Sequence, residues 1–344
     1  MKTKLSNGKL ATAAEWFASG TRNIYSLKDK ELIEPSKPSY GQLGHVHVFS
    51  KVNNKESNET NWISFLPGFP DGSFGWSRVD QELHEIGISN PQLFVEYIGQ
   101  GDSDKPEDYA YSTYERADLV EAQWKANEIK ETFLVTFDYS SLVAMELLCR
   151  QEERSVLNNQ LKTKISGVLM INGGLFADAH SHPLMTTPLL KTAIGKMGAR
   201  MAGKNRKVFD LMMKGLWSPE YGVSQAELGE VFDAISRRNG AVFMSNAARF
   251  VDEHKQNAKR WDLARLYHAL SLAVKFYVVG SEQDPFEYKQ IDAAKKRLAA
   301  QGLSVRKVPG GHMTTSEQPQ QLADIIVEVI NRQARPGASG AENY

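Results

Sequence analysis

The sequence predicts an α/β protein built on a mostly parallel sheet that is flanked by helices and carries an inserted helical cap. Short apolar runs alternate with helical stretches, which is typical of parallel sheets covered on both faces. One long interval, residues 176–265, contains helical patterns but no convincing strand. The chain has 344 residues, of which 41% are hydrophobic and 24% are charged, so it is large enough to bury such a core.

The predicted strands are short runs of apolar, β-branched and aromatic residues that end at turn signals. They cover residues 45–49, 62–66, 92–97, 132–137, 167–171 and 274–279, with a weaker run at 304–308. The predicted helices of the core cover residues 112–127, 141–153, 287–301 and 317–334. Because helical stretches separate most of the strands from residue 62 onward, consecutive strands are expected to run parallel.

The interval 176–265 interrupts this alternation. Its helical patterns cover residues 187–201, 208–216, 224–237 and 241–256. We therefore predict a sheet core made of residues 1–175 and 266–344, and a helical cap made of residues 176–265. An insertion of this kind commonly covers a site at the carboxyl edge of the strands.

Composition excludes several classes of protein. Lys plus Arg and Asp plus Glu both number 41, so no basic excess favours nucleic acid as a partner. The single cysteine, Cys149, cannot form an internal disulfide or a cysteine-based metal cluster, and no metal site is predicted. No apolar run has the length of a signal peptide or a membrane-spanning helix, so a cytoplasmic location is expected.

The segment FLVTFDYSSLVAMELL (133–148) is the most informative about chemistry. A strand stops at Asp138 and a helical pattern starts almost at once, as in a nucleophile elbow. Such a turn needs small residues two positions before and after the nucleophile, and Thr136 and Ser140 satisfy this around Asp138. Around Ser140 the same rule fails because Leu142 is too large. An aspartate after a strand is more often a helix cap, so this segment alone leaves both interpretations open.

Three further motifs follow strands. FLPGFPDGSFGW (65–76) runs from a strand into a Gly/Pro turn, which is either a tight loop or a backbone oxyanion site. YVVGSEQDPF (277–286) places the acid Asp284 after a strand, and VPGGHMTTSEQP (308–319) places His312 between a strand and a helix. The order nucleophile, acid, histidine matches a known catalytic order, and four motifs in that order are stronger than any one of them.

Together these motifs resemble the α/β-hydrolase superfamily, in particular its epoxide hydrolase and haloalkane dehalogenase group with an aspartate nucleophile. The resemblance covers residues 40–333. PGFPDGSFGW is similar to that group's oxyanion loop, EYIGQGDSDKP (96–106) to its next conserved stretch, and TFDYSS (136–141) to its elbow. INGGLF (171–176), the PEYG stretch at Tyr221 and RW (260–261) look closest to the mesoderm-specific transcript subgroup.

The resemblance implies a mechanism that needs no cofactor. Asp138 would attack an electrophilic carbon and form an alkyl-enzyme ester, which water activated by His312 would hydrolyse. Asp284 would orient the ring of His312. The backbone amides of Phe69 and Tyr139 would receive the oxyanion that develops on the ester.

Opening an epoxide also requires a proton donor, and the resembling epoxide hydrolases use tyrosines of the cap. Tyr221 and Tyr267 are the candidates, with Tyr221 preferred. The simpler interpretation of either tyrosine is packing plus one hydrogen bond.

Departures from the family pattern affect the choice of reaction. Pro67 replaces a histidine, and Thr136 and Ser140 replace glycine at the elbow. Phe69 and Tyr139 stand where dehalogenases carry the asparagine and tryptophan that bind halide. The sequence therefore favours an epoxide hydrolase-like enzyme acting on a small apolar molecule.

Several alternatives stay open at this point. They are a haloalkane dehalogenase, a β-lactone-type enzyme with an aspartate nucleophile, and a catalytically silent hydrolase-fold protein used for binding. A serine esterase with Ser140 as nucleophile is the least favoured, because Leu142 crowds that turn. The oligomeric state is left open.

The predicted cap carries a basic segment. Residues 179–209 contain no acid, and their basic residues are Lys191, Lys196, Arg200, Lys204, Arg206 and Lys207. Five methionines lie in or just after the segment, at positions 185, 197, 201, 212 and 213. The segment is a solvated basic face, a methionine-lined substrate entrance, or a surface at 191–207 that docks weakly on anionic lipid.

Overall fold

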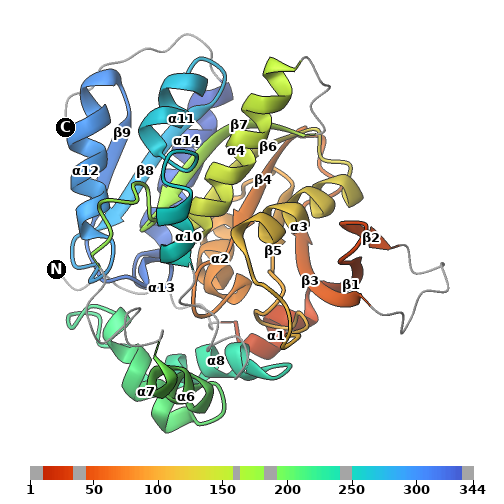
Figure 1. Cartoon of the computed structure of the whole chain (residues 1–344), viewed down its shortest axis with the longest axis vertical. Helices are drawn as coiled ribbons and strands as arrows, with labels where there is room; N and C mark the ends of the chain where they lie inside the picture. Colours follow the sequence, from red (N-terminus) through yellow and green to blue (C-terminus); the bar gives the residue numbers. More distant parts are fainter. Residues whose placement is uncertain (1–10, 34–43, 158–162, 182–191, 241–249, 335–344) are drawn as a thin grey trace.

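The computed structural model describes residues 11–33, 44–157, 163–181, 192–240 and 250–334. These residues form a nine-stranded sheet with the strand order β2-β1-β3-β5-β4-β6-β7-β8-β9 (Figure 1). The strands are β1 (Thr21–Ser26), β2 (Glu31–Ile33), β3 (His45–Asn53), β4 (Asn61–Leu66), β5 (Gln92–Val95), β6 (Glu131–Phe137), β7 (Lys164–Ile171), β8 (Lys275–Ser281) and β9 (Ser304–Val308).

Most of this sheet is parallel, as the sequence predicts. β5, β4, β6, β7, β8 and β9 run in one direction, whereas β2, β1 and β3 join them by antiparallel pairing. The hairpin of β1 and β2 was not predicted. It lies at the edge of the sheet, and most of its residues are partly exposed, so its sequence lacks a continuous apolar run.

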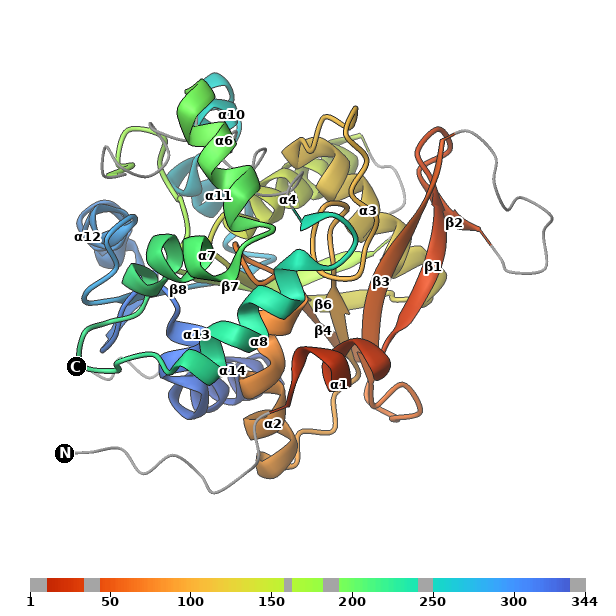
Figure 2. The ribbon, with the colours of Figure 1, turned by 90° about the horizontal axis from the view of Figure 1, so that it is seen from below.

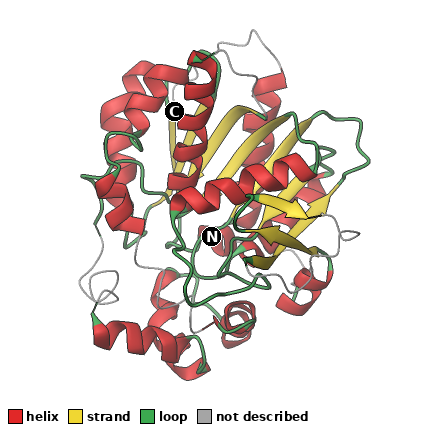
Figure 3. Ribbon diagram, turned by 45° about the vertical axis from the view of Figure 1, so that its right-hand side comes forward, coloured by secondary structure: helices red, strands yellow, loops and turns green. Residues whose placement is uncertain are grey.

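Helices cover both faces of the sheet (Figure 3). One buried cluster joins the sheet to α3 (Thr113–Ala126), α4 (Ser140–Val156), α11 (Leu263–Leu270) and α12 (Tyr288–Leu298). The other joins it to α1 (Ala13–Ala18), α2 (Ser77–Ile86) and α14 (Pro319–Ala334). α3 begins where predicted because Ser112 and Glu115 form a capping box.

The described residues between β7 and β8 form helices and loops but no strand, as predicted. They contain α6 (Ala193–Ala202), α7 (Arg206–Met213), η2 (Lys214–Leu216), α8 (Gln225–Ser236) and α10 (Phe250–Gln256) before α11. α6, α7 and α8 form a layer of their own beside the sheet (Figures 1 and 2). α10 is instead tied to the start of α3, where Thr113 donates to the Glu253 carboxylate through its amide and its hydroxyl.

The boundaries 176–265 of the cap stay a prediction. Parts of two predicted helices, residues 187–191 and 241–249, lie outside the described residues. No helix among the described residues is both long and apolar enough to cross a membrane.

The carboxyl ends of the parallel strands meet at one edge of the sheet. Leu66 of β4 pairs with Thr136 of β6, and Phe137 pairs with Ile171 of β7. Further along, Ser281 of β8 pairs with Val308 of β9. The loops that carry the three predicted catalytic side chains therefore leave the sheet at the same edge.

Candidate active site

Asp138 occupies the sharp turn between β6 and α4. Its φ angle is +56°, in the left-handed region that side chains other than glycine rarely adopt. The amide of Asp138 donates to the carbonyl of Ile171 at 2.9 Å, which extends the pairing of β6 and β7 into the turn. The elbow expected from the sequence is thus formed around Asp138.

Two glycines allow the neighbouring loops to approach this elbow. A Cβ atom on Gly68 would lie 2.3 Å from the ring of Phe137 and 3.0 Å from Cβ of Asp138. A Cβ atom on Gly173 would lie 2.5 Å from Oγ of Ser141. Any side chain at either position would push a loop away from Asp138.

Backbone amides contact the Asp138 carboxylate. The amide of Phe69 donates to Oδ2 at 3.1 Å, and the amide of Tyr139 lowers the pKa of the same carboxylate. These are the two amides that the sequence analysis assigned to an oxyanion hole. The other oxygen, Oδ1, faces His312.

His312 lies between two carboxylates. Its Nδ1 atom is 3.1 Å from both oxygens of Asp284, and its Nε2 atom is 3.8 Å from Oδ1 of Asp138. All three side chains are buried. Oδ1 of Asp284 also accepts from the amide of Phe286 at 2.8 Å, which fixes the carboxylate and hence the imidazole. The structure therefore brings the three predicted side chains together.

Both the sheet and the helical insertion hold the loop that carries His312. Nδ2 of Asn172, at the end of β7, donates to the carbonyl of His312 at 2.8 Å. The amide of His312 donates to the carbonyl of Leu216 in η2 at 2.7 Å. The insertion is thus adjacent to the site.

The electrostatics favour a charged pair at neutral pH. Burial raises the pKa of Asp138 to about 6, although the His312 charge and the two amides oppose this. Burial also disfavours the charged form of His312, but attraction to Asp284 outweighs it and raises the pKa of His312 to about 9. Near pH 7 the free site therefore holds an ionised Asp138 beside a protonated His312.

The unusual residues of the elbow are accommodated by hydrogen bonds. The buried hydroxyl of Ser140 donates to the carbonyl of Pro67 and accepts from the hydroxyl of Tyr97 at 2.8 Å. The hydroxyl of Ser141 donates to the carbonyl of Asp138 at 2.8 Å. Because its hydroxyl already donates to a carbonyl, Ser140 lacks the arrangement of a nucleophilic serine.

The two predicted proton donors lie in different places. The hydroxyl of Tyr221 donates to Glu227 at 2.9 Å and accepts from Arg78 at 2.5 Å. Neither of these two hydrogen bonds of Tyr221 involves Asp138. Tyr221 is half-buried, and burial raises the pKa of its hydroxyl well above the usual range.

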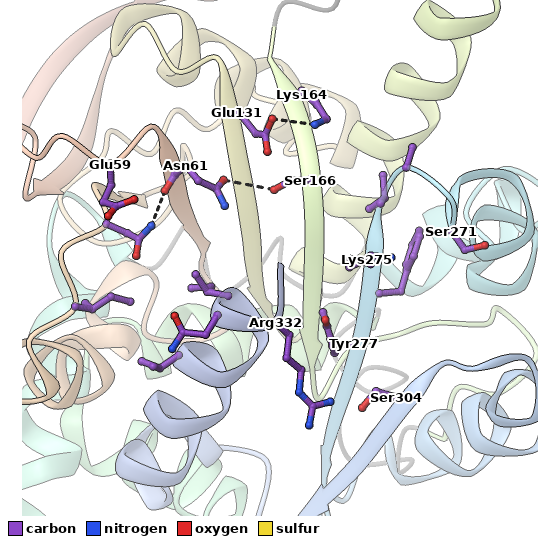
Figure 4. Close-up of a pocket in the computed structure, with 18 of the residues that line it drawn as sticks. Glu59, Asn61, Glu131, Lys164, Ser166, Ser271, Lys275, Tyr277, Ser304 and Arg332 are labelled. Carbon is purple, nitrogen blue, oxygen red and sulfur yellow. Dashed lines mark hydrogen bonds and ion pairs between the residues drawn. The ribbon is translucent and has the colours of Figure 1, made fainter. Parts of the chain in front are cut away.

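The prediction for Tyr267 is wrong. Its hydroxyl donates to the carbonyl of Gln301 at 2.8 Å, and its side chain lines a groove at the amino ends of the strands, opposite the site. Figure 4 shows this groove with Asn61, Lys164 and Ser304, each of them at or near the start of a strand. The reason is that residue 267 belongs to α11, which packs on the sheet core outside the cap layer.

Sequence reasoning missed a third carboxyl group near Asp138. Asp71 is 2% exposed, and its Oδ1 atom has no partner among the described residues. Burial raises the pKa of Asp71 to about 7. The charge of His312 lowers this pKa, whereas the charge of Asp138 raises it. The position of Asp71 in PGFPD was visible in the sequence, but its burial depends on the tertiary structure.

A buried chain of titratable groups lies beside the site. Nδ1 of His180 is 3.0 Å from Glu287, and its Nε2 atom is 2.7 Å from Nδ1 of His254. Nε2 of His254 is 2.8 Å from the carbonyl of Trp261, so this nitrogen carries the proton. These hydrogen bonds connect His180 and His254, near the two ends of the helical insertion, to Glu287, which precedes α12.

Metal ligation and thiol chemistry find no support in the described part of the chain. No group of three or more His, Cys, Asp or Glu side chains there is arranged to hold a metal ion. Cys149 is buried, and burial raises the pKa of its thiol to about 11, which keeps it in the unreactive thiol form.

Comparison with known proteins identifies a matching family and several similar chains. The family model described as the alpha/beta hydrolase family matches residues 65–325. Over 279 residues the chain is 24% identical to the human mesoderm-specific transcript homolog protein, covering 78% of each chain. It is also 24% identical to the putative hydrolase LipZ of Mycobacterium tuberculosis over 274 residues, 79% of this chain and 89% of LipZ.

Solved structures share the fold. The haloalkane dehalogenase DbeA from Bradyrhizobium elkani superimposes with a TM-score of 0.66 at 16% identity, over 92% of this chain and 99% of that one. At this level of identity the likeness concerns the fold alone.

Proposed function

The chain belongs to the alpha/beta hydrolase family, and we propose that it is a cofactor-free cytoplasmic hydrolase that opens an epoxide or a similar electrophilic carbon. Its nucleophile is Asp138. One observation carries this proposal: a single carboxylate at the elbow accepts the backbone amide of Phe69 on one oxygen and faces a histidine–aspartate pair with the other. A carboxylate is ionised near neutral pH and attacks without a base.

In the proposed reaction the two oxygens of Asp138 have different tasks. Oδ1 does not accept from the amide of Phe69. It forms the new bond to the substrate carbon, while the carbon–oxygen bond of the epoxide breaks. Oδ2 then becomes the carbonyl oxygen of the ester and keeps the amide of Phe69. The ester is therefore held with its carbonyl in the oxyanion hole before water attacks.

Hydrolysis of the ester depends on His312. Forming the ester removes the negative charge of Asp138, which lowers the pKa of His312, so that His312 gives its proton to the Asp71 carboxylate left by the first step. The neutral ring then takes a proton from water, the hydroxide adds to the ester carbon, and Oδ2 carries the developing charge. When the ester bond breaks, His312 gives this proton to the leaving alkoxide and takes up the carboxyl proton of Asp138, which restores the ionised Asp138 and the protonated His312.

The opened epoxide oxygen needs a proton in the first step. We assign this task to Asp71, because its buried carboxyl has an Oδ1 atom without a partner among the described residues and follows by two residues Phe69, whose amide donates to Asp138. With a pKa of about 7, a large fraction of Asp71 is protonated at neutral pH. Tyr221 remains the alternative donor, although its hydroxyl proton already bonds to Glu227.

Trapping the ester tests this proposal. His312→Gln blocks the second step, so incubation with a panel of epoxides should add the mass of one substrate to the protein, mapped by peptide analysis to Asp138. Asp138→Asn in the same background should remove the adduct. Wild-type protein that turns over no epoxide, haloalkane or ester would favour the binding-protein alternative.

A haloalkane dehalogenase is the second function that an observation favours. The indole Nε1–H of Trp217 is buried and has no partner among the described residues. Trp217 follows Leu216, whose carbonyl accepts from His312, so the backbone of Trp217 adjoins the His312 loop. Halide release from chloroalkanes that Trp217→Phe abolishes would support this function, and no release from the wild type would exclude it.

A further inference from the structure

Arg116 on α3 is a buried cation without a counter-ion. The residue is 8% exposed, and its guanidinium forms no hydrogen bond or ion pair with any residue that the structure describes. Its Nε atom is fully buried. Arginine is rarely buried unless it is paired, because removing a charge from water is unfavourable.

Aromatic rings form part of its surroundings. The guanidinium carbon of Arg116 lies 4.6 Å from the ring centre of Tyr139 and 5.7 Å from that of Tyr97. Such contacts are favourable, but a ring face cannot satisfy all the N–H donors of a guanidinium. The hydroxyl of Tyr97 is engaged by Ser140. The hydroxyl of Tyr139 is buried and has no partner among the described residues.

Both donors lie at the residue that follows the nucleophile. Tyr139 comes directly after Asp138 in the chain, and its ring centre lies 5.9 Å from that of Phe250 at the start of α10. A ligand that accepts from Arg116 and from the Tyr139 hydroxyl would therefore contact the side chain that follows Asp138 in the sequence.

We propose that Arg116 and the Tyr139 hydroxyl bind a carboxylate of the substrate next to Asp138. This rests on the proposed function and narrows its substrate class to carboxylic acids that carry an electrophilic carbon on a short apolar chain. One guanidinium and one hydroxyl match the single charge and two oxygens of a carboxylate. Because Asp138 is itself negative, an anionic substrate needs this cation to offset repulsion at the nucleophile.

Binding of a matched pair of probes tests the proposal without turnover. Hexanoate and hexanamide have the same chain and differ in charge, and their dissociation constants are measured by calorimetry. Wild-type protein should bind hexanoate about tenfold or more tightly than hexanamide, since hydrogen bonds to a charged group are the strong ones. Equal binding of both probes to the wild type would overturn the proposal, whether or not any variant folds.

Variants separate this site from the proposed reaction. Arg116→Gln should abolish the preference for hexanoate, and Arg116→Lys should retain part of it. Arg154→Gln is the matched control, because the Arg154 guanidinium is already paired with Glu121 at 2.6 Å, and it should leave the preference intact. Asp138→Asn should strengthen hexanoate binding by removing repulsion. If no ester ever forms on Asp138 but these variants change hexanoate binding as expected, the carboxylate site is supported and the proposed reaction is contradicted.

A second surface stands on different observations. The outer side of α6 and α7 exposes large apolar side chains: Ile194 is 74% exposed, Met197 60% and Leu211 75%. Lys196 and Arg200 lie among them on α6, and residues 192–209 contain no acid. Apolar groups exposed together with basic ones are typical of helices that lie on lipid surfaces.

We infer that α6 and α7 dock on an anionic lipid bilayer, with the apolar side chains inserted and the basic ones at the headgroups. This extends the sequence prediction for residues 191–207, of which Lys191 lies outside the described residues. Charge complementarity identifies the partner, since the surface is basic and the bilayer is negative. η2, which directly follows α7, holds the His312 loop through the carbonyl of Leu216.

Cosedimentation with vesicles tests this inference. The protein should sediment with vesicles that contain phosphatidylserine at low salt, and less so with pure phosphatidylcholine or at high salt. The double variant Ile194→Glu, Met197→Glu should lose this binding. Leu272→Glu changes a fully exposed apolar residue after α11 and should not. No binding at low salt, or equal binding by the double variant, would overturn the inference.

Discussion

Replacing Asp284 by asparagine should separate the two steps of the reaction. Both oxygens of Asp284 lie 3.1 Å from Nδ1 of His312, and their charge opposes the effect of burial on the ring. Without that charge, the pKa of His312 should fall from about 9 to its ordinary value of 6.5 or below. The difference corresponds to about 3 kcal/mol of stabilisation of the imidazolium.

Losing the stabilisation that Asp284 gives to His312 should slow hydrolysis of the ester rather than its formation. Asp138 attacks as a carboxylate and needs no base, whereas water must be deprotonated by a correctly oriented His312. We expect hydrolysis of the ester to slow by roughly 10²–10⁴-fold, the usual contribution of a general base. Rapid-quench single turnovers followed by intact mass should show an ester that accumulates in Asp284→Asn and is transient in the wild type.

Glu287→Gln is the matched control for Asp284→Asn. Glu287 is also buried, lies three residues further along the chain, and acts on His312 through its charge without contacting the ring. Its replacement should change hydrolysis far less. If Asp284→Asn hydrolysed the ester at the wild-type rate while Glu287→Gln did not, the assignment of the acid would be refuted.

Three further predictions concern Asp138, Ser140 and Tyr267. The rate of ester formation, measured in single turnovers of the wild type, should fall as the pH drops through about 6, because protonation removes the attacking form of Asp138; a flat profile would contradict this. Ser140→Ala leaves the buried carbonyl of Pro67 without its donor and should lower the free energy of unfolding in urea by about 1–3 kcal/mol, and an unchanged value would show that the bond adds nothing. Tyr267→Phe should leave kcat/KM unchanged, because its hydroxyl bonds to Gln301 far from the site; lost turnover would contradict that placement.

The parallel part of the sheet could be predicted because its strands are buried on both faces. β6 and β7 are continuous apolar runs, and helices separate them along the chain. The β1–β2 hairpin could not, since Thr21–Ser26 mixes exposed and buried positions at an edge. Its pairing with β3 is a tertiary feature without a local signal.

The elbow could be identified because its requirements are local. Small residues around Asp138 and a strand that changes directly into a helix are visible in the sequence. Asp284 and His312 follow from chain order once the elbow is known, and the structure places them within 3.1 Å of each other. The proton donor depends on which element faces the site, and the sequence placed Tyr267 wrongly for that reason.

Charges were the least predictable part of the site. Arg116 is an ordinary helix residue in the sequence, and only the structure shows that it is buried without a partner. The same holds for Asp71, whose raised pKa comes from burial. Pairing and desolvation depend on what the folded chain places around a group, and no local pattern carries that information.

The central claim, that Asp138 is the nucleophile, is tested most directly by a single turnover in water labelled with oxygen-18. Hydroxide that His312 generates would add to the ester carbon of Asp138, so the label should enter the Asp138 carboxylate and the first product should carry unlabelled oxygen from the protein. Peptide mass analysis locates the label. Label that appears only in the product, with none in Asp138, would mean that water attacks the substrate directly and would contradict the account.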